Sequence, residues 1–175
     1  YAKNIPAYGY RLYQITRAAG NGRIADKSRL SCTITADLTK IETPFYQIKL
    51  NENGEIESFY DKENGRCVDC GRPMNVFRAY EDKPQRFDAW DVDVYYKEKP
   101  YHSFVRTDAK VLTQGERLVI RQIWNFNHSA LTQDMILSAR NRRIDFVTTI
   151  DWKEKQVFLK TYFPVNVHAE EASYE

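Results

Sequence analysis

Residues 117–126 read Arg-Leu-Val-Ile-Arg-Gln-Ile-Trp-Asn-Phe, and residues 131–138 read Leu-Thr-Gln-Asp-Met-Ile-Leu-Ser. In both runs a large side chain that can be buried occupies almost every second position. Successive side chains of a β-strand point to opposite faces of the sheet, so this period of two predicts two strands that each bury one face. The side chains expected on the buried faces are Leu118, Ile120, Trp124 and Phe126 in the first run and Leu131, Gln133, Met135 and Leu137 in the second.

The same alternation recurs on either side of this pair. Asn51-Glu52-Asn53-Gly54 predicts a hairpin turn after a strand at 45–50, because Asn-Gly tolerates the positive φ angles of tight turns. Thr113-Gln114-Gly115-Glu116 predicts a second hairpin, between strands at 103–112 and 117–126. Further strands are expected at 55–60, 144–150 and 157–163, with turns at 61–66 and 141–143. Each such sheet has one apolar face that only a second layer can cover, so we predict an all-β fold built as an antiparallel β-sandwich.

Length, charge and cysteine content narrow the function classes. A chain of 175 residues fits one domain, which would bury about 70% of its unfolded surface. The net charge is +2 and the basic residues are scattered among acids, so neither nucleic acid nor a membrane is an expected partner. No run approaches the roughly 20 apolar residues of a spanning helix, and no signal-peptide pattern is present. Three cysteines, an odd number, favour a reducing compartment, so we expect a cytoplasmic location.

Two regions are expected along the chain. Residues 1–30 are interpreted as an N-terminal segment that enters a strand, followed by a mobile Gly-, Asn-, Lys- and Arg-rich loop; residues 31–175 form the β-sandwich domain. The chain begins without Met, and its last residues stop where the pattern of another strand begins. The sequence therefore predicts a truncated sandwich that is part of a longer polypeptide.

The stretch from Tyr80 to Asp93 combines acids, aromatics and a proline without a strand or helix period. Aromatics in a loop either pack the loop down or meet a ligand, and flat apolar faces beside carboxylates suit a sugar. Composition alone leaves both readings open. A catalytic carboxylate pair would need a defined separation, about 5 Å for retention or 6.5–9.5 Å for inversion, which loop spacing cannot establish.

Other chemistry-bearing residues form weaker patterns. Cys67 and Cys70 have the C-x-x-C spacing of half a zinc site, but the second pair is missing, and a redox motif would need a βαβ context. His102, His128 and His168 are far apart and have no partner at metal-ligand spacing. No nucleophile elbow or phosphate-binding glycine loop is present. These patterns give no support for nucleophilic catalysis or for a metal site in this chain, so a carboxylate pair is the one catalytic option that composition allows.

Residues 75–100, N-V-F-R-A-Y-E-D-K-P-Q-R-F-D-A-W-D-V-D-V-Y-Y-K-E-K-P, closely resemble a stretch of the C-terminal half of glycoside hydrolase family 38, the α-mannosidases. Segments 45–62, 143–152 and 159–165 resemble further runs of that family in the same order, and residues 5–10 resemble the join that precedes them. Departures are Thr43, where an Asn is common, and the two cysteines at 67 and 70. The resemblance spans nearly the whole chain.

The resemblance implies the fold and the setting of the activity. It implies part of a supersandwich similar to galactose mutarotase, in a cytoplasmic α-mannosidase that hydrolyses terminal α-mannosides with retention. In that family the nucleophile, the acid/base carboxyl and a zinc ion belong to an N-terminal catalytic domain, so this chain alone is expected to be inactive and to hold no cofactor. Its expected partners are the α-mannoside or oligosaccharide substrate and the rest of its own polypeptide.

Within such an enzyme the sandwich would be accessory, supplying a wall to the cleft, an interdomain docking surface or a carbohydrate contact. The residues expected to face substrate are Tyr80, Asp88, Trp90 and Asp91. Two alternatives remain open: a stand-alone carbohydrate-binding or mutarotase-like module, and a purely structural interdomain element.

Overall fold

The computed structural model describes residues 6, 8–14, 30–88 and 90–171, and this part of the chain is built almost entirely of β-strands. All strand pairings in it are antiparallel, so the predicted all-β class is confirmed. The strands are β1 Thr33–Ile34, β2 Lys40–Glu42, β3 Tyr46–Leu50, β4 Ile56–Asp61, β5 Arg66–Cys67, β6 Val76–Glu81, β7 Val105–Thr113, β8 Arg117–Phe126, β9 Ser129–Ser138, β10 Ile144–Asp151 and β11 Val157–Tyr162. One 3-10 turn, η1 (Tyr96–Glu98), interrupts them.

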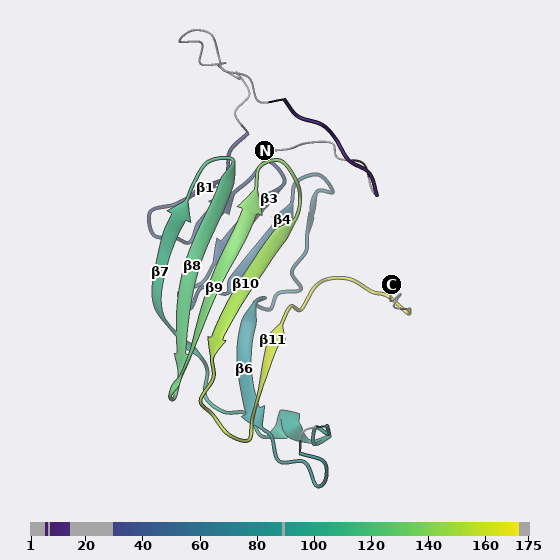
Figure 1. Ribbon diagram of the computed structural model, residues 1–175, viewed down its shortest axis with the longest axis vertical. Coiled ribbons are helices and arrows are strands. Elements are labelled where there is room, and N and C mark those ends of the chain that lie inside the picture. The colour runs from purple at the N-terminus through teal and green to yellow at the C-terminus, as the bar shows by residue number, and fades with distance from the viewer. Residues whose placement is uncertain (1–5, 7, 15–29, 89, 172–175) are drawn as a thin grey trace.

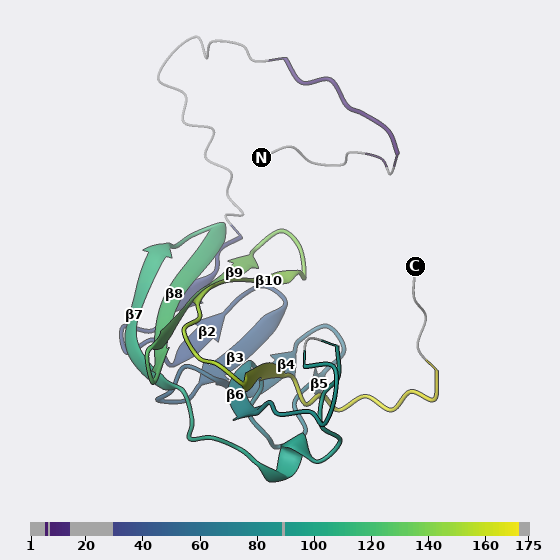
Figure 2. The same ribbon diagram turned by 60° about the horizontal axis from the view of Figure 1, so that its bottom comes forward.

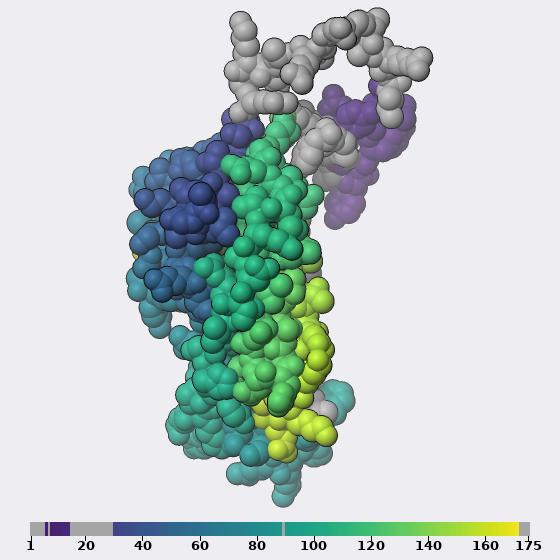
Figure 3. Space-filling view, turned by 90° about the vertical axis from the view of Figure 1, so that its left-hand side faces the viewer, coloured from purple at the N-terminus to yellow at the C-terminus, as the bar shows by residue number. Residues whose placement is uncertain are grey.

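The strands form three sheets. A five-stranded sheet has the order β1-β2-β3-β4-β5, a four-stranded sheet the order β10-β9-β8-β7, and β6 pairs with β11 alone. The two larger sheets lie face to face as a sandwich, and the β6–β11 ribbon lies at one end of it (Figures 1 and 2). An isolated bridge between Ile56 of β4 and Met74 joins the segment before β6 to the five-stranded sheet. Seen from the side, the β1–β4 layer and the β7–β9 layer lie against each other (Figure 3). Expected turns at 51–54, 113–116 and 141–143 all connect consecutive strands.

The predicted alternation of β8 and β9 produces the core. Every second side chain of β9 is buried, and the inward residues of β8 and β9 are paired across the ladder, with Leu118 opposite Leu137 and Ile120 opposite Met135. These side chains form a first hydrophobic cluster with Ile41, Ile48 and Leu50 of the five-stranded sheet. Burying a side chain of this size contributes about 1.5–3 kcal/mol, so the two faces stabilise each other.

A second cluster, rich in aromatic rings, lies towards the other end of the sandwich. Phe77 of β6 meets Trp124 edge-on at 5.1 Å between ring centroids, and Phe104 stacks on Phe126 at 4.7 Å. Ala79 and Leu131 are buried in the same cluster. Aromatic pairs in these geometries contribute about 0.5–1.5 kcal/mol beyond their buried area, so this cluster holds the β6–β11 ribbon to the sandwich.

Two side-chain amides are buried on the core face of the four-stranded sheet, opposite each other on β8 and β9. Gln122 and Gln133 are paired in register, and both are almost completely buried. Gln122 donates to the carbonyl of Gly54 at 3.2 Å and accepts from the Arg106 guanidinium at 3.1 Å. Gln133 accepts from the buried Asn75 side chain at 2.7 Å. These bonds satisfy polar atoms that would otherwise be costly to bury, and they tie β8 and β9 to the β3–β4 turn and to the start of β6.

Some sequence-based expectations are changed by the structure. Tyr80 and Glu81, expected at the start of a loop, end strand β6, because they pair with Phe158 and Val157 of β11. Residues 8–14 form no strand, since no neighbouring strand pairs with them. The expected mobile loop at 18–29 lies entirely outside the described residues, and the boundary at residue 30 stays a prediction. Within the described residues no helix is long and apolar enough to cross a membrane.

Replacing Gly54 with alanine should destabilise the fold by about 2–5 kcal/mol, from left-handed backbone strain together with overpacking. Gly54 has φ +76°, and a Cβ there would lie 1.9 Å from Oε1 of Gln122. Gly65→Ala is the matched control, because Gly65 has φ +62° but a Cβ there would lie 3.9 Å from the Tyr60 hydroxyl, an ordinary van der Waals distance. Urea unfolding of both variants measures the difference, and equal losses of stability would contradict this role of the Gly54–Gln122 contact.

Candidate functional site

The candidate site lies in the segment between β6 and β7. This segment leaves β6 after Glu81 and comes back beside the same strand at residues 99–101. At its base, Glu81 donates its backbone N–H to the Lys99 carbonyl at 3.0 Å, and Tyr101 donates to the Ala79 carbonyl at 2.9 Å. On the other side, Asp82 donates to the Gln156 carbonyl at 2.8 Å. Because both ends are fixed to β6, residues 82–99 form a closed loop with a defined base, hereafter the 82–99 loop.

Two local devices shape the 82–99 loop. Phe87 has φ +54°, and its carbonyl accepts from the backbone N–H groups of Trp90 and Asp91 at 2.7 and 2.9 Å, which makes a tight turn. Asp93 accepts from the Tyr95 N–H at 3.0 Å and from the Lys99 ammonium at 3.1 Å. The Tyr95 N–H and the Lys99 ammonium together hold the pKa of Asp93 below its usual range. Asp93 therefore stays ionised at neutral pH and organises the loop rather than donating a proton.

The four expected substrate-facing residues lie in different environments. Trp90 is 89% exposed, and its neighbour Asp91 lines a surface hollow; Asp88 is exposed but is not part of that hollow. Tyr80 is only 4% exposed and lies beneath the loop. Trp90 and Asp91 are thus adjacent at the surface, whereas a ligand in the hollow would meet Tyr80 only through the loop. Their role towards substrate stays a prediction.

The hollow has a volume of about 340 Å³. Its walls come from both arms of the 82–99 loop: Pro84, Gln85, Arg86, Asp91, Val92, Asp93, Val94 and Tyr95. This volume is at the low end of the range of roughly 300–1,000 Å³ seen for ligand pockets. Apolar walls with two carboxylates, a guanidinium and an amide can receive a hydroxylated ligand by C–H contacts and hydrogen bonds.

A tyrosine cluster that the sequence analysis did not identify supports the loop from below. The Tyr80 and Tyr162 hydroxyls are hydrogen-bonded at 2.9 Å, and the Tyr80 ring meets the Tyr96 ring edge-on at 5.2 Å. Lys160 donates to the Tyr96 hydroxyl at 2.7 Å. Period-two alternation in 157–162 already places Phe158, Lys160 and Tyr162 on one face, but which segment covers that face depends on the return path of the loop.

The cluster shifts two phenol pKa values in opposite directions. The Lys160 ammonium, by its hydrogen bond, lowers the pKa of Tyr96. Burial, and then the hydrogen bond with Tyr80, raises the pKa of Tyr162 to about 12. One carboxylate atom at the base of the loop stands apart from this network: Oδ1 of Asp82 is buried and has no hydrogen-bond partner among the described residues.

The cysteines and histidines do not gather at the site. Cys67 and Cys70 are exposed and Cys32 is buried, and all three are free thiols. His102 stacks on Phe126 at 4.8 Å. In the described part of the chain no group of three or more His, Cys, Asp or Glu side chains could hold a metal ion. The described residues of the 82–99 loop therefore include no such metal-ligand group.

Replacing Tyr162 with phenylalanine should reduce the loss of unfolding free energy that occurs as the pH rises from about 10 to about 12. An ordinary tyrosine titrates near pH 10, whereas Tyr162 in the folded chain titrates at about 12. The folded state then binds more protons than the unfolded state between these values, so the contribution of Tyr162 is complete below about pH 10 and is lost as the pH rises to about 12. Urea unfolding from about pH 8 to 12 measures this, and equal slopes for both proteins would contradict it.

Comparison with known proteins places this chain in a family. The model of the glycosyl hydrolases family 38 C-terminal domain matches residues 41–175. α-Mannosidase G of Dictyostelium discoideum is 26% identical over 98% of this chain and 17% of its own length. An α-mannosidase of Saccharomyces cerevisiae is 31% identical over 67% of the chain and 11% of its own length. Human α-mannosidase 2C1 is 30% identical over 77% of the chain and 13% of its own length.

The family match includes every strand from β3 to β11 as well as the whole 82–99 loop. The chain spans less than a fifth of the length of the relatives named above. The match at the level of the domain, together with the all-β sandwich, leads to one assignment. The chain belongs to glycosyl hydrolase family 38 and corresponds to its C-terminal domain.

Proposed function

We propose that this chain is the accessory β-sandwich portion of an α-mannosidase that hydrolyses terminal α-mannosides with retention. In this proposal the 82–99 loop forms part of the wall of the substrate cleft. The observation that carries the proposal is Trp90, which is 89% exposed on a loop that is fixed at both ends. A large exposed indole is uncommon on a surface without a ligand or a partner, and it provides a flat face for the C–H groups of a sugar ring.

The roles of the loop residues follow from their surroundings. Trp90 would stack on the sugar, and Asp91, which follows it directly, would accept from a hydroxyl. Tyr80 of β6 and Tyr96 of the loop would act as positioning residues, since the contact between their rings holds the loop against the ribbon. This arrangement orients a substrate without supplying a nucleophile or an acid, which is the property expected of a cleft wall.

Catalysis and zinc are proposed to belong to another part of the polypeptide. Asp93 is held ionised by Lys99 and the Tyr95 N–H and is thereby a poor proton donor. The described residues offer no group of side chains that fits a zinc ion. We therefore assign no catalytic step to this chain and expect it to be inactive alone. Three free thiols, two of them exposed, support a reducing, cytoplasmic location.

A purely structural role is the second candidate, and a specific observation favours it. A groove of about 180 Å³ between the β4 edge and β10 has walls formed only by apolar side chains, among them Phe59, Phe146 and Phe163. Val94 and Tyr95 add exposed apolar surface on the loop itself. Apolar patches of this kind mark interfaces, so docking against the rest of the polypeptide would account for them without any sugar contact.

Replacing Trp90 with alanine, and separately Asp91 with alanine, in the full-length enzyme should each lower kcat/KM for an α-mannoside by about five- to tenfold, the effect of losing a contact of about 1 kcal/mol. The melting temperature should stay within about 1–2 °C, because both side chains are exposed. Val147→Ala is the control, since Val147 is 55% exposed on β10, far along the chain from the loop.

The two roles predict different results. Unchanged kinetics in both loop variants would remove the cleft-wall proposal, and a loss of stability with normal kinetics would favour docking. An NMR titration of the 175-residue chain with mannose tests the third class. Shifts at 84–95 with a millimolar or lower Kd would favour a stand-alone carbohydrate-binding module, whereas no shift combined with impaired enzyme kinetics agrees with a wall that binds only within the assembled cleft.

A further inference from the structure

A second hollow lies at the opposite end of the sandwich from the 82–99 loop, where β8 begins and β9 turns into β10. Its volume is about 390 Å³. The residues that line it are Glu116, Arg117, Ile136, Leu137, Ser138, Arg140, Asn141, Arg143 and Asp145. It shares no residue with the hollow of the loop, so its chemistry is a separate question.

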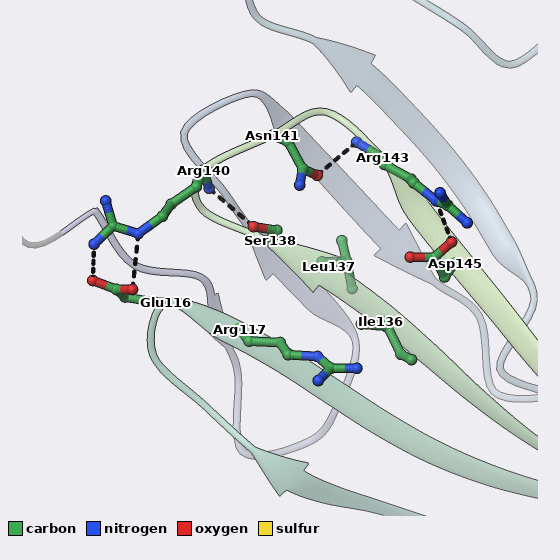
Figure 4. A pocket seen from close by; sticks show the side chains of 9 residues that line it. All are labelled: Glu116, Arg117, Ile136, Leu137, Ser138, Arg140, Asn141, Arg143 and Asp145. Carbon is green, nitrogen blue, oxygen red and sulfur yellow. Dashed lines mark hydrogen bonds and ion pairs between the residues drawn. The ribbon is translucent and has the colours of Figure 1, made fainter. Parts of the chain in front are cut away.

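Two of its three arginines are already paired. Arg140 makes a two-point interaction with Glu116, with Nε donating to Oε2 at 2.8 Å and a second nitrogen bonding Oε1. Arg143 pairs with Asp145. Figure 4 shows the first pair on one side of the hollow and the second on the other. These carboxylates are therefore occupied, and each pair fixes the position of its guanidinium.

Arg117 is different. Its side chain runs along the sheet beside Ile136, and within the described part of the chain its guanidinium makes no hydrogen bond and no ion pair (Figure 4). A guanidinium has five N–H donors in a fixed fork that matches an oxyanion. Arg121, four residues further along β8, shows the alternative, because it donates to both oxygens of Asp134 at 2.7 Å. Arg117 has no such carboxylate among the described residues and lines an open hollow instead.

Other groups at the hollow add to this charge. Three arginines against Glu116 and Asp145 leave a net charge of +1 among the lining residues. Ser138 accepts the Arg140 backbone N–H at 3.1 Å, so its hydroxyl proton is available for a further acceptor. We propose that this hollow binds the phosphate group of a small ligand, with Arg117 as its main contact.

Phosphate suits the site better than a carboxylate because donors lie around the hollow on three elements: Arg117 on β8, Ser138 at the end of β9, and Arg140, Asn141 and Arg143 in the β9–β10 turn. A tetrahedral group presents at least three terminal oxygens to donors around it, whereas a planar carboxylate presents two. The remaining volume leaves room for the organic part of a phosphate ester. Free phosphate and a sugar phosphate share this chemistry, and the experiment separates them.

The test is an NMR titration of the 15N-labelled 175-residue chain at constant ionic strength with inorganic phosphate, mannose 6-phosphate, mannose and acetate. We expect saturable shifts of residues 116–117 and 138–145 with both phosphate compounds, with a Kd in the millimolar range or below. Tighter binding of mannose 6-phosphate than of inorganic phosphate would identify an ester as the ligand, and equal binding would identify free phosphate. Equal shifts with mannose or acetate would overturn the phosphate assignment.

Substitutions of Arg117 test whether its guanidinium is the main contact of the phosphate. Arg117→Gln should weaken phosphate binding at least tenfold, and Arg117→Lys, which keeps the charge but loses the fork, should give an intermediate loss. Arg72→Gln removes an exposed guanidinium outside the hollow and should leave the Kd unchanged. Thermal melting shows that the variants remain folded. No saturable binding by the unmodified chain, or equal binding by Arg117→Gln, would overturn the proposal, and neither result bears on the kinetics of the Trp90 variant.

Discussion

The buried amides of Gln122 and Gln133 are the constraint on which the sandwich depends. They face each other across β8 and β9 on the core side, and each bonds to a different part of the fold. Through the Gly54 carbonyl, the first fixes the β3–β4 turn against β8; through Asn75, the second fixes the start of β6. An unpaired amide at this depth would cost about 1–3 kcal/mol, so alternative registers of either layer are disfavoured.

The bond between Asn75 and Gln133 fixes the start of β6, and the two faces of this strand have different roles. Phe77 and Ala79 enter the aromatic cluster around Trp124, whereas the opposite face carries Tyr80 beneath the 82–99 loop. Docking of β6 on the core therefore also positions the base of the loop. The hydroxyl pair between Tyr80 and Tyr162 joins the two strands of the ribbon at this face. The loop that carries Trp90 is therefore fixed at its base, and a cleft wall would need such a fixed base.

Sequence reasoning was most successful for the strands and least successful for the surroundings of the site. Period-two alternation identified the buried side chains of β8 and β9, and Asn-Gly identified the β3–β4 turn, because both signals depend on residues close together in the chain. The same reasoning placed Tyr80 in the loop, although it ends β6. Its pairing with Phe158 joins residues 78 positions apart, and no local pattern reports such a contact. Tyr96 and Lys160 were missed for the same reason.

The sequence by itself determined the all-β class, the alternation of buried and exposed side chains and the resemblance to the C-terminal domain of family 38, since each rests on residue types at fixed spacings. Only the tertiary structure decided which segments lie together. It placed Trp90 and Asp91 at the surface and buried Tyr80 under Tyr96. It also left the Arg117 guanidinium facing a hollow instead of a carboxylate. The physical reason is that side-chain surroundings are set by contacts between strands distant in the chain, which local periodicity does not encode.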